Sequence, residues 1–189
     1  MKLISTIRFY DLLISFVVLI IFSPLIIFTL LICFLETRKP IFVQKRVGKY
    51  KKTFNLFKFR TMHLDTPSIA SHLVNKKSVT KFGRFIRLAK IDELPQLFNV
   101  IKGEMSLVGP RPCLLNQKEL ILYRNKYRIF NVLPGITGLA QIKGVDMSDP
   151  EKLSKLDNHM ISNLNLLNYF KYLFLTLYGQ GRGDKINNK

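Results

Sequence analysis

The sequence predicts an α+β, mostly helical protein: an N-terminal re-entrant membrane helix-hairpin followed by a compact cytoplasmic domain with interfacial helices and a small β-hairpin. Three observations support this prediction. Residues 12–35 carry no charge, residues 40–62 are rich in β-branched and aromatic residues, and residues 164–178 read as an apolar, aromatic helix. We expect residues 1–37 to form the membrane-inserted segment and residues 38–189 to form the cytosolic domain.

The uncharged run is long enough to enter a bilayer. At about 1.5 Å per residue it reaches roughly 36 Å, against a hydrocarbon core of about 30 Å. Ser23 and Pro24 lie at its middle, where an interior proline costs about 3 kcal/mol and bends the helix. We expect a break at this position, with the Ser23 hydroxyl available to a freed backbone carbonyl.

The charges on both sides of this run bear on its topology. Basic residues flank it on each side: Lys2, Arg8, Arg38, Lys39, Lys45 and Arg46. Basic flanks favour the cytoplasm, so a helix that enters and returns satisfies both, whereas a straight span exports one of them. The sequence favours re-entry, and an ordinary kinked span is the alternative.

The composition indicates an anionic partner. The 189 residues include 30 Lys and Arg against 12 Asp and Glu, for a formal net charge of +18. Nucleic acid, acidic lipid headgroups or a polyphosphate substrate would each fit this surplus. A hydrophobic content of 48% excludes a disordered basic tail. The spacing of Cys33 and Cys113 does not fit a zinc site or a disulfide framework, so reduced thiols are expected.

Residues 40–62 predict two short strands around a turn near Gly48. In the second strand Lys58 and Arg60 lie on the same side of an extended chain and offer two cations to one ligand. A basic, solvated strand face is the alternative. The polar stretch 63–80 is expected to be a loop.

An acidic pair, Asp92 and Glu93, stands among basic residues. Arg84 and Arg87 are three residues apart and share a helix face before it. The pair is expected to open a second helix, with Pro95 tolerated in the first turn. The plain alternative is that Asp92 is an N-cap and Glu93 a favourable charge near the helix dipole.

Arg111 shifts the interpretation towards phosphoryl chemistry. Pro110 and Pro112 fix the backbone on either side of it, which suits a guanidinium that grips phosphate at two points. Carboxylates and phosphate coexist where a divalent cation is present, so Mg²⁺ or Mn²⁺ held by Asp92 and Glu93 is expected. Carboxylates also attack phosphorus to form acyl phosphates.

Two later segments leave alternatives open. In residues 133–144, Gly135, Gly138 and Gly144 either let backbone amides approach a phosphate or nucleobase, or simply form turns. The helix at 164–178 is either part of the core or an interfacial helix, and its aromatic residues favour partial membrane contact.

Four motifs then occur in a specific order: Ser23-Pro24, "FKFRTM" (57–62), "TKFGRFIRLAKIDELPQLFNVIKGEMSLVGPRP" (80–112) and "LPGITGLAQIKG" (133–144). Together they resemble the small monotopic phosphoglycosyl transferases of bacteria, also called bacterial sugar transferases. The resemblance covers nearly the whole chain. It also implies a re-entrant helix at Ser23-Pro24.

The resemblance implies an activity and a set of roles. Members transfer a sugar-1-phosphate from a UDP-sugar to a polyprenol phosphate, usually undecaprenyl phosphate, and release UMP. By the family pattern Asp92 is the nucleophile that forms a phosphosugar-aspartate, and Glu93 is a metal ligand or general base. The positions expected to bind phosphate are Lys58, Arg60, Arg84, Arg87 and Arg111.

The resemblance also implies a place and partners. The reaction would occur at the cytoplasmic face of the bacterial inner membrane, as the first membrane step of capsule, O-antigen or glycoprotein glycan assembly. Besides the membrane and both substrates, a second copy of the chain or downstream glycosyltransferases are candidate partners, and nucleic acid is not expected.

Three positions depart from the family pattern: Val145 replaces a common arginine, Met160 a tyrosine, and Asn168 an acidic residue. These departures bear on substrate recognition, and the compact chain favours an N-acetylated or modified UDP-sugar. The alternative function is a non-catalytic, membrane-tethered basic module that binds nucleic acid or acidic lipid. It would be indifferent to replacement of Asp92 and Glu93.

Overall fold

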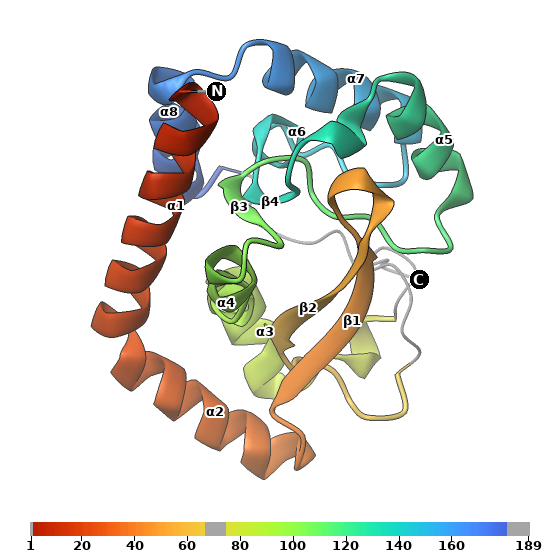
Figure 1. Ribbon diagram of the computed structural model, residues 1–189. Coiled ribbons are helices and arrows are strands. Elements are labelled where there is room, and N and C mark those ends of the chain that lie inside the picture. Colours follow the sequence, from red (N-terminus) through yellow and green to blue (C-terminus); the bar gives the residue numbers. More distant parts are fainter. Residues whose placement is uncertain (1, 67–74, 181–189) are drawn as a thin grey trace.

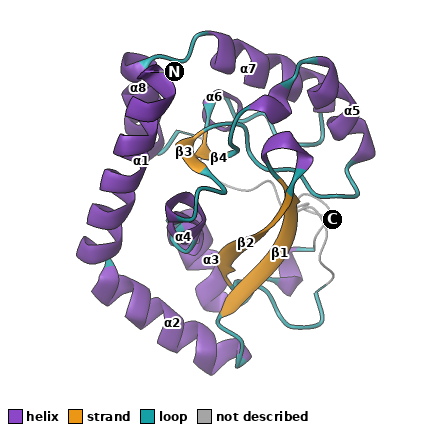
Figure 2. Ribbon diagram, in the orientation of Figure 1, coloured by secondary structure: helices purple, strands orange, loops and turns teal. Residues whose placement is uncertain are grey.

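The protein is mostly helical, as predicted, with two small two-stranded sheets among the helices (Figures 1 and 2). Its computed structural model describes residues 2–66 and 75–180. The elements are α1 (Lys2–Ile21), α2 (Ser23–Thr37), β1 (Ile41–Val47), η1 (Lys49–Lys51), β2 (Thr53–Phe59), η3 (Lys76–Ser78), α3 (Lys81–Leu88), η4 (Ile91–Glu93), α4 (Gln96–Ile101), β3 (Ser106–Val108), α5 (Lys118–Lys126), η5 (Ile129–Asn131), β4 (Gly135–Thr137), α6 (Leu139–Ile142), α7 (Pro150–Ser162) and α8 (Leu166–Leu177).

The N-terminal apolar segment is two helices joined at an open bend. Pro24 has no N–H, so the Ile20 carbonyl lacks its helical donor, and the Ser23 hydroxyl donates to that carbonyl at 2.8 Å instead. From this bend α1 and α2 diverge around one side of the domain (Figure 1). They do not lie along each other as the two arms of a hairpin would, and the path of the segment through a membrane stays a prediction.

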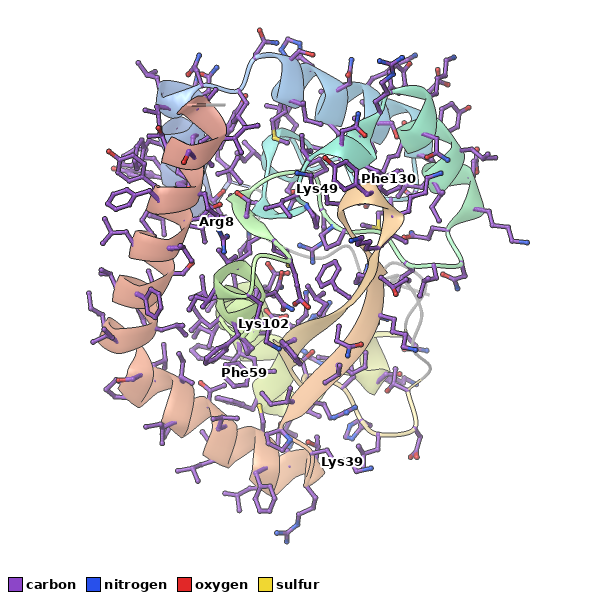
Figure 3. The ribbon with its side chains drawn as sticks, viewed as in Figure 1. Arg8, Lys39, Lys49, Phe59, Lys102 and Phe130 are labelled. Atoms are coloured by element: carbon purple, nitrogen blue, oxygen red, sulfur yellow. The ribbon has the colours of Figure 1, made fainter. Side chains whose placement is uncertain are left out.

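Polar contacts attach α1 to the rest of the domain. Arg8 points from α1 towards the end of α4 (Figure 3) and donates to the Ile101 carbonyl at 3.1 Å. One turn further on, the buried Asp11 carboxylate accepts hydrogen bonds from the Leu107 N–H at 2.9 Å and the Tyr169 hydroxyl at 2.8 Å. These bonds join α1 to α4, β3 and α8.

The outward face of both helices is apolar. Residues 3–21 form the one helix in the described part of the chain that is long and apolar enough to cross a membrane, by length and composition only. Only 17% of its apolar window is buried. The large apolar side chains exposed on α1 and α2 are Leu3, Ile4, Phe9, Leu13, Phe16, Val17, Ile20, Ile21, Ile27, Phe28, Leu31, Phe34 and Leu35. Exposed apolar side chains in this number along two successive helices indicate an interaction site.

The predicted β-hairpin is confirmed. β1 and β2 pair antiparallel on either side of Gly48, with Phe42 opposite Lys58 and Ile41 opposite Phe59. Phe59 (Figure 3) is buried in a cluster with Cys33 of α2. The Asn99 side chain in α4 is bonded to the backbone of β2, accepting from Phe57 N–H at 3.1 Å. The hairpin is therefore fixed against α2 and α4.

A second, parallel sheet was not predicted. Ser106 of β3 pairs with Gly135 of β4, and Val108 pairs with Thr137. This pairing brings the loop at 109–114 against the glycine-rich segment at 133–144. Of the loop predicted over 63–80, residues 67–74 lie outside the described residues, and the remainder includes the short turn η3.

Helix α8 combines both interpretations of residues 164–178. Tyr169 and Tyr172 are buried in the main core, whereas Leu167, Phe170 and Phe174 are exposed. The helix lies beside α1, where the rings of Phe170 and Tyr10 are 5.1 Å apart. Its exposed side chains therefore extend the apolar surface of α1.

Candidate active site

The acidic pair lies in a short 3₁₀ turn, η4, rather than in the first turn of the following helix. Lys90 precedes it in the left-handed region, with φ of 57°. Pro95 has no N–H to donate to the Ile91 carbonyl, and the Leu94 N–H bonds to that carbonyl at 3.1 Å instead. α4 then begins only at Gln96. The expected helix start at the acidic pair is thus wrong by one turn.

The N-cap interpretation of Asp92 is also wrong. The N-cap position of η4 is Lys90 and that of α4 is Pro95, and neither start has a side-chain capping hydrogen bond. Asp92 is nevertheless only 4% exposed. A buried carboxylate that does not cap a helix is a candidate for chemistry.

The Glu93 carboxylate forms ion pairs with two cations. The Lys58 ammonium and the Arg111 guanidinium each lie 2.7 Å from Oε1 of Glu93. The same ammonium lies 3.9 Å from Oδ2 of Asp92. The structure therefore brings four predicted site residues, from β2, η4 and the loop after β3, into one cluster.

The charges of this cluster keep Glu93 ionised. Burial alone would raise the pKa of the Glu93 carboxyl, but the charges and hydrogen bonds of Arg111 and Lys58 outweigh it and hold that pKa well below its usual range. At neutral pH Glu93 is therefore a carboxylate that holds two cations beside Asp92.

The other predicted cations lie around this cluster in different ways. α3 packs against η4, and Arg87 in α3 donates to the Thr61 hydroxyl at 3.2 Å. Arg84 is exposed on the same helix. Arg60 shares the face of Lys58, but its guanidinium lies over the Phe42 ring and its Nε donates to the Lys39 carbonyl at 2.8 Å.

The glycines of residues 133–144 serve close backbone packing. A Cβ at Gly135 would lie 2.0 Å from the Gly109 nitrogen, and one at Gly138 would lie 2.5 Å from the Gly109 oxygen. The Gly135 N–H donates to the Pro110 carbonyl at 2.9 Å. These glycines therefore seat the loop that carries Arg111, a role that sequence reasoning did not assign to them.

Sequence reasoning also missed a buried ion pair behind Arg111. Arg124 of α5 lies 2.7 Å from Asp157 of α7, and both side chains are 2% exposed. A signal was present, because Asp157 shares a helix face with the buried Leu153 and Met160. A charge within an apolar stripe predicts a buried partner.

The three residues that depart from the family pattern, Val145, Met160 and Asn168, each contact other parts of the domain. Met160 is buried in the main core, and its sulfur lies 3.2 Å from the Leu139 nitrogen. Asn168 donates to the Asn163 carbonyl at 2.7 Å, between α7 and α8. Val145 packs against a second apolar cluster. Met160 therefore joins α7 to α6, and Asn168 joins α8 to the end of α7.

The carboxylates suit a divalent cation only together with substrate. Among the described residues, no group of three or more His, Cys, Asp and Glu side chains could hold a metal ion. Mg²⁺ is commonly held by one or two carboxylates plus substrate phosphates, and Asp92 and Glu93 supply such hard oxygen donors. The residues present therefore fit Mg²⁺ or Mn²⁺ when a diphosphate completes the ligand set.

The chain was also compared with known proteins. A family model described as bacterial sugar transferase matches residues 3–181. The chain is 45% identical to the uncharacterized sugar transferase EpsL of Bacillus subtilis over 145 residues, which cover 76% of this chain and 71% of EpsL. It is also 34% identical over 186 residues to the undecaprenyl-phosphate galactose phosphotransferase of Salmonella typhimurium, covering 89% of this chain and 39% of that protein.

A third relative is the undecaprenyl-phosphate glucose phosphotransferase of Komagataeibacter xylinus, 38% identical over 187 residues. The match covers 90% of this chain and 35% of that relative. The chain therefore spans well under half the length of these two phosphotransferases.

Proposed function

The chain belongs to the bacterial sugar transferase family, and from this premise we propose that it transfers a sugar-1-phosphate from a UDP-sugar to undecaprenyl phosphate and releases UMP. The names of the Salmonella and Komagataeibacter relatives assign them to undecaprenyl-phosphate sugar transfer. For the donor we propose an N-acetylated or modified sugar, and for the pathway the first membrane step of a surface glycan.

Two displacements at one site account for the transfer. An Asp92 oxygen attacks the sugar-bearing phosphorus of the donor, the bond from that phosphorus to the bridging oxygen breaks, and UMP leaves. A phosphate oxygen of undecaprenyl phosphate then attacks the phosphorus of the phosphosugar-aspartate and releases the Asp92 carboxylate. The two substrates, one in water and one in lipid, need not be bound together.

One observation carries this proposal above all: a buried carboxylate, Asp92, lies beside a second carboxylate that already holds two cations. Lys58 and Arg111 offset the repulsion between Asp92 and an incoming diphosphate. The depressed pKa of Glu93 makes it a poor proton acceptor at neutral pH. We therefore assign Glu93 to holding cations rather than to general base catalysis.

The remaining cations would bind the outer parts of the substrates. Arg87, on the helix packed against η4, is assigned to a donor phosphate, and the exposed Arg84 and the half-buried Arg60 to the rim of the site. Asp92 and Glu93 would hold Mg²⁺ or Mn²⁺ together with the diphosphate. Such a cation neutralises charge on the phosphoryl oxygens.

The apolar outer face of α1 and α2 supports a membrane location. We propose that this face enters the cytoplasmic leaflet and that the bend at Ser23-Pro24 returns the chain to the same side. The polyprenol phosphate headgroup lies at the interface, and basic residues near an anionic leaflet each add about 1 kcal/mol of attraction. Residues 38–189 would then form the cytosolic catalytic domain.

Trapping of the intermediate tests the proposal. Protein incubated with the UDP-sugar that supports turnover, in the absence of lipid acceptor, is expected to gain the mass of the phosphosugar on the peptide containing Asp92. Asp92→Asn is expected to lose UMP release, whereas Asp65→Asn, in an exposed loop, keeps it. A panel of UDP-sugars with undecaprenyl phosphate identifies the donor first.

The controls separate this function from the alternative. UMP release that survives Asp92→Asn would remove Asp92 from its role. If no UDP-sugar gives UMP and the protein instead binds nucleic acid or acidic vesicles equally well with and without the carboxylates, the non-catalytic basic module is correct.

A further inference from the structure

The backbone that carries Arg111 is held from behind by two guanidinium groups. Arg124 donates to the Arg111 carbonyl at 2.8 Å, and Arg46 donates to the next carbonyl, that of Pro112, at 3.0 Å. Pro110 and Pro112 supply no N–H of their own. Because these two prolines cannot donate backbone hydrogen bonds, the carbonyls of residues 110–112 fix the segment by accepting them.

The guanidinium of Arg124 is itself oriented by a buried carboxylate. Asp157 lies 2.7 Å from the other terminal nitrogen of the Arg124 guanidinium, and both side chains are 2% exposed. A chain of contacts thus runs from Asp157 through Arg124 to the Arg111 carbonyl, and from the Arg111 side chain to Glu93.

Stability alone is a weak reason for such a pair. Replacing a buried ion pair by apolar side chains of similar volume is often neutral or stabilising, because burying two charges is unfavourable. Apolar side chains in these places would still join α5 to α7. They could not donate a hydrogen bond to the Arg111 carbonyl.

We propose that Arg124 and Asp157 are positioning residues for Arg111. Asp157 orients the Arg124 guanidinium, which fixes the Arg111 backbone and so places the Arg111 guanidinium at Glu93 and at the donor phosphates. That the Arg111 guanidinium contacts the donor phosphates rests on the proposed function. A displacement of about 1 Å at a reacting group lowers rates by about 100-fold, so the effect is measurable.

The test uses the full chain in detergent and separates placement from stability. The double substitution Arg124→Met with Asp157→Leu is expected to keep the melting temperature within a few degrees but to lower kcat/KM for UMP release by 10- to 100-fold. Leu153→Ala, in the same helix α7 and 2% exposed, is the matched control. It is expected to lower the melting temperature and leave kcat/KM within about 3-fold.

A double-mutant cycle gives the second readout. Asp157→Asn is expected to lower kcat/KM in the parent chain and to have little further effect after Arg111→Lys, because both changes disturb the same guanidinium. Asp157→Glu restores the carboxylate and is expected to recover part of the rate. Additive effects of Asp157→Asn and Arg111→Lys would overturn the proposal. So would a kcat/KM equal to that of the parent chain when Arg124→Met and Asp157→Leu are combined.

A third readout does not depend on turnover. In ¹⁵N-labelled protein, the Arg111 Nε–H resonance, assigned with Arg111→Lys, is expected to shift or broaden in the double substitution and to stay in place in Leu153→Ala. If the parent chain releases no UMP with any donor, the proposed function fails, and the resonance still decides whether the ion pair places Arg111.

Discussion

The hydroxyl of Tyr169 in α8 donates a hydrogen bond of 2.8 Å to the carboxylate of Asp11 in α1, across 158 residues of sequence. Leu107 N–H and the Ser106 hydroxyl donate to the same carboxylate. An unpaired buried polar group costs about 1–3 kcal/mol. We expect Tyr169→Phe to lower the free energy of unfolding by about 1 kcal/mol, and Asp11→Ala, which leaves all three donors unpaired, by about 3 kcal/mol.

Thermal unfolding in detergent checks this prediction. Tyr178→Phe, at a residue that is 76% exposed, is the control and is expected to leave the melting temperature unchanged. Equal melting temperatures for the parent and Asp11→Ala would show that these bonds do not attach α1.

The contribution of Glu93 to stability is expected to depend on pH in one direction. Its pKa is depressed in the folded protein, so the stability it adds is fully present above the unfolded pKa of about 4.3 and is lost as pH falls towards the folded pKa. The difference in unfolding free energy between the parent and Glu93→Gln, about 2 kcal/mol, is expected to be constant from pH 5 to 8 and to shrink below about pH 4.

Denaturant unfolding at a series of pH values measures this difference. Glu151→Gln is the control, because Glu151 forms an exposed pair with Lys155 on the surface of α7. A difference that falls between pH 6 and 7 would mean that Glu93 titrates near neutrality and is available as a base.

Close backbone packing predicts a sharp contrast between two glycines. Gly135→Ala would place a Cβ 2.0 Å from the Gly109 nitrogen, whereas Gly144→Ala finds nothing within 4 Å and bears only the strain of a φ of 66°. We expect Gly144→Ala to cost about 1 kcal/mol and to retain UMP release. Gly135→Ala is expected to displace the Arg111 loop and to abolish UMP release. Equal activity of the two variants would contradict this role of the glycine.

Cysteine labelling tests the re-entrant path. Cys33 and Cys113 are free and buried, so an impermeant thiol reagent reports on introduced cysteines. In intact cells neither Lys2→Cys nor Lys45→Cys is expected to react, and both are expected to react after the membrane is opened. Adding Pro24→Leu removes a helix break of about 3 kcal/mol and is expected to expose position 2 to the outside. Labelling of Lys2→Cys in intact cells without that change would indicate a true span.

The parts of the fold that local sequence determines could be predicted. A proline within an apolar run specified the break between α1 and α2, and strand-forming residues on both sides of Gly48 specified the β1–β2 hairpin. The helix start expected at the acidic pair was wrong, because Pro95 cannot donate to the Ile91 carbonyl and the pair lies in the 3₁₀ turn η4 instead.

Contacts between distant segments could not be predicted. The parallel pairing of Ser106 with Gly135 leaves no periodic signal in three-residue strands. Asp11 reads as the charged flank of an apolar run, because its donors are about 95 and 158 residues away. The Arg124–Asp157 pair joins two helices through residues that are 33 positions apart in the sequence. Each partner is visible in the sequence only as an isolated charge among residues that the structure buries.

The bond between Asp11 and Tyr169 also sets an order of events during translation. Asp11 emerges from the ribosome 158 residues before its partner. At about 5–20 residues per second, that interval lasts roughly 8–30 s, far longer than helix formation. With the membrane location proposed above, the nascent apolar segment would enter lipid well before α8 is synthesised, and the rest of the chain would complete its folding against a helix already in the membrane.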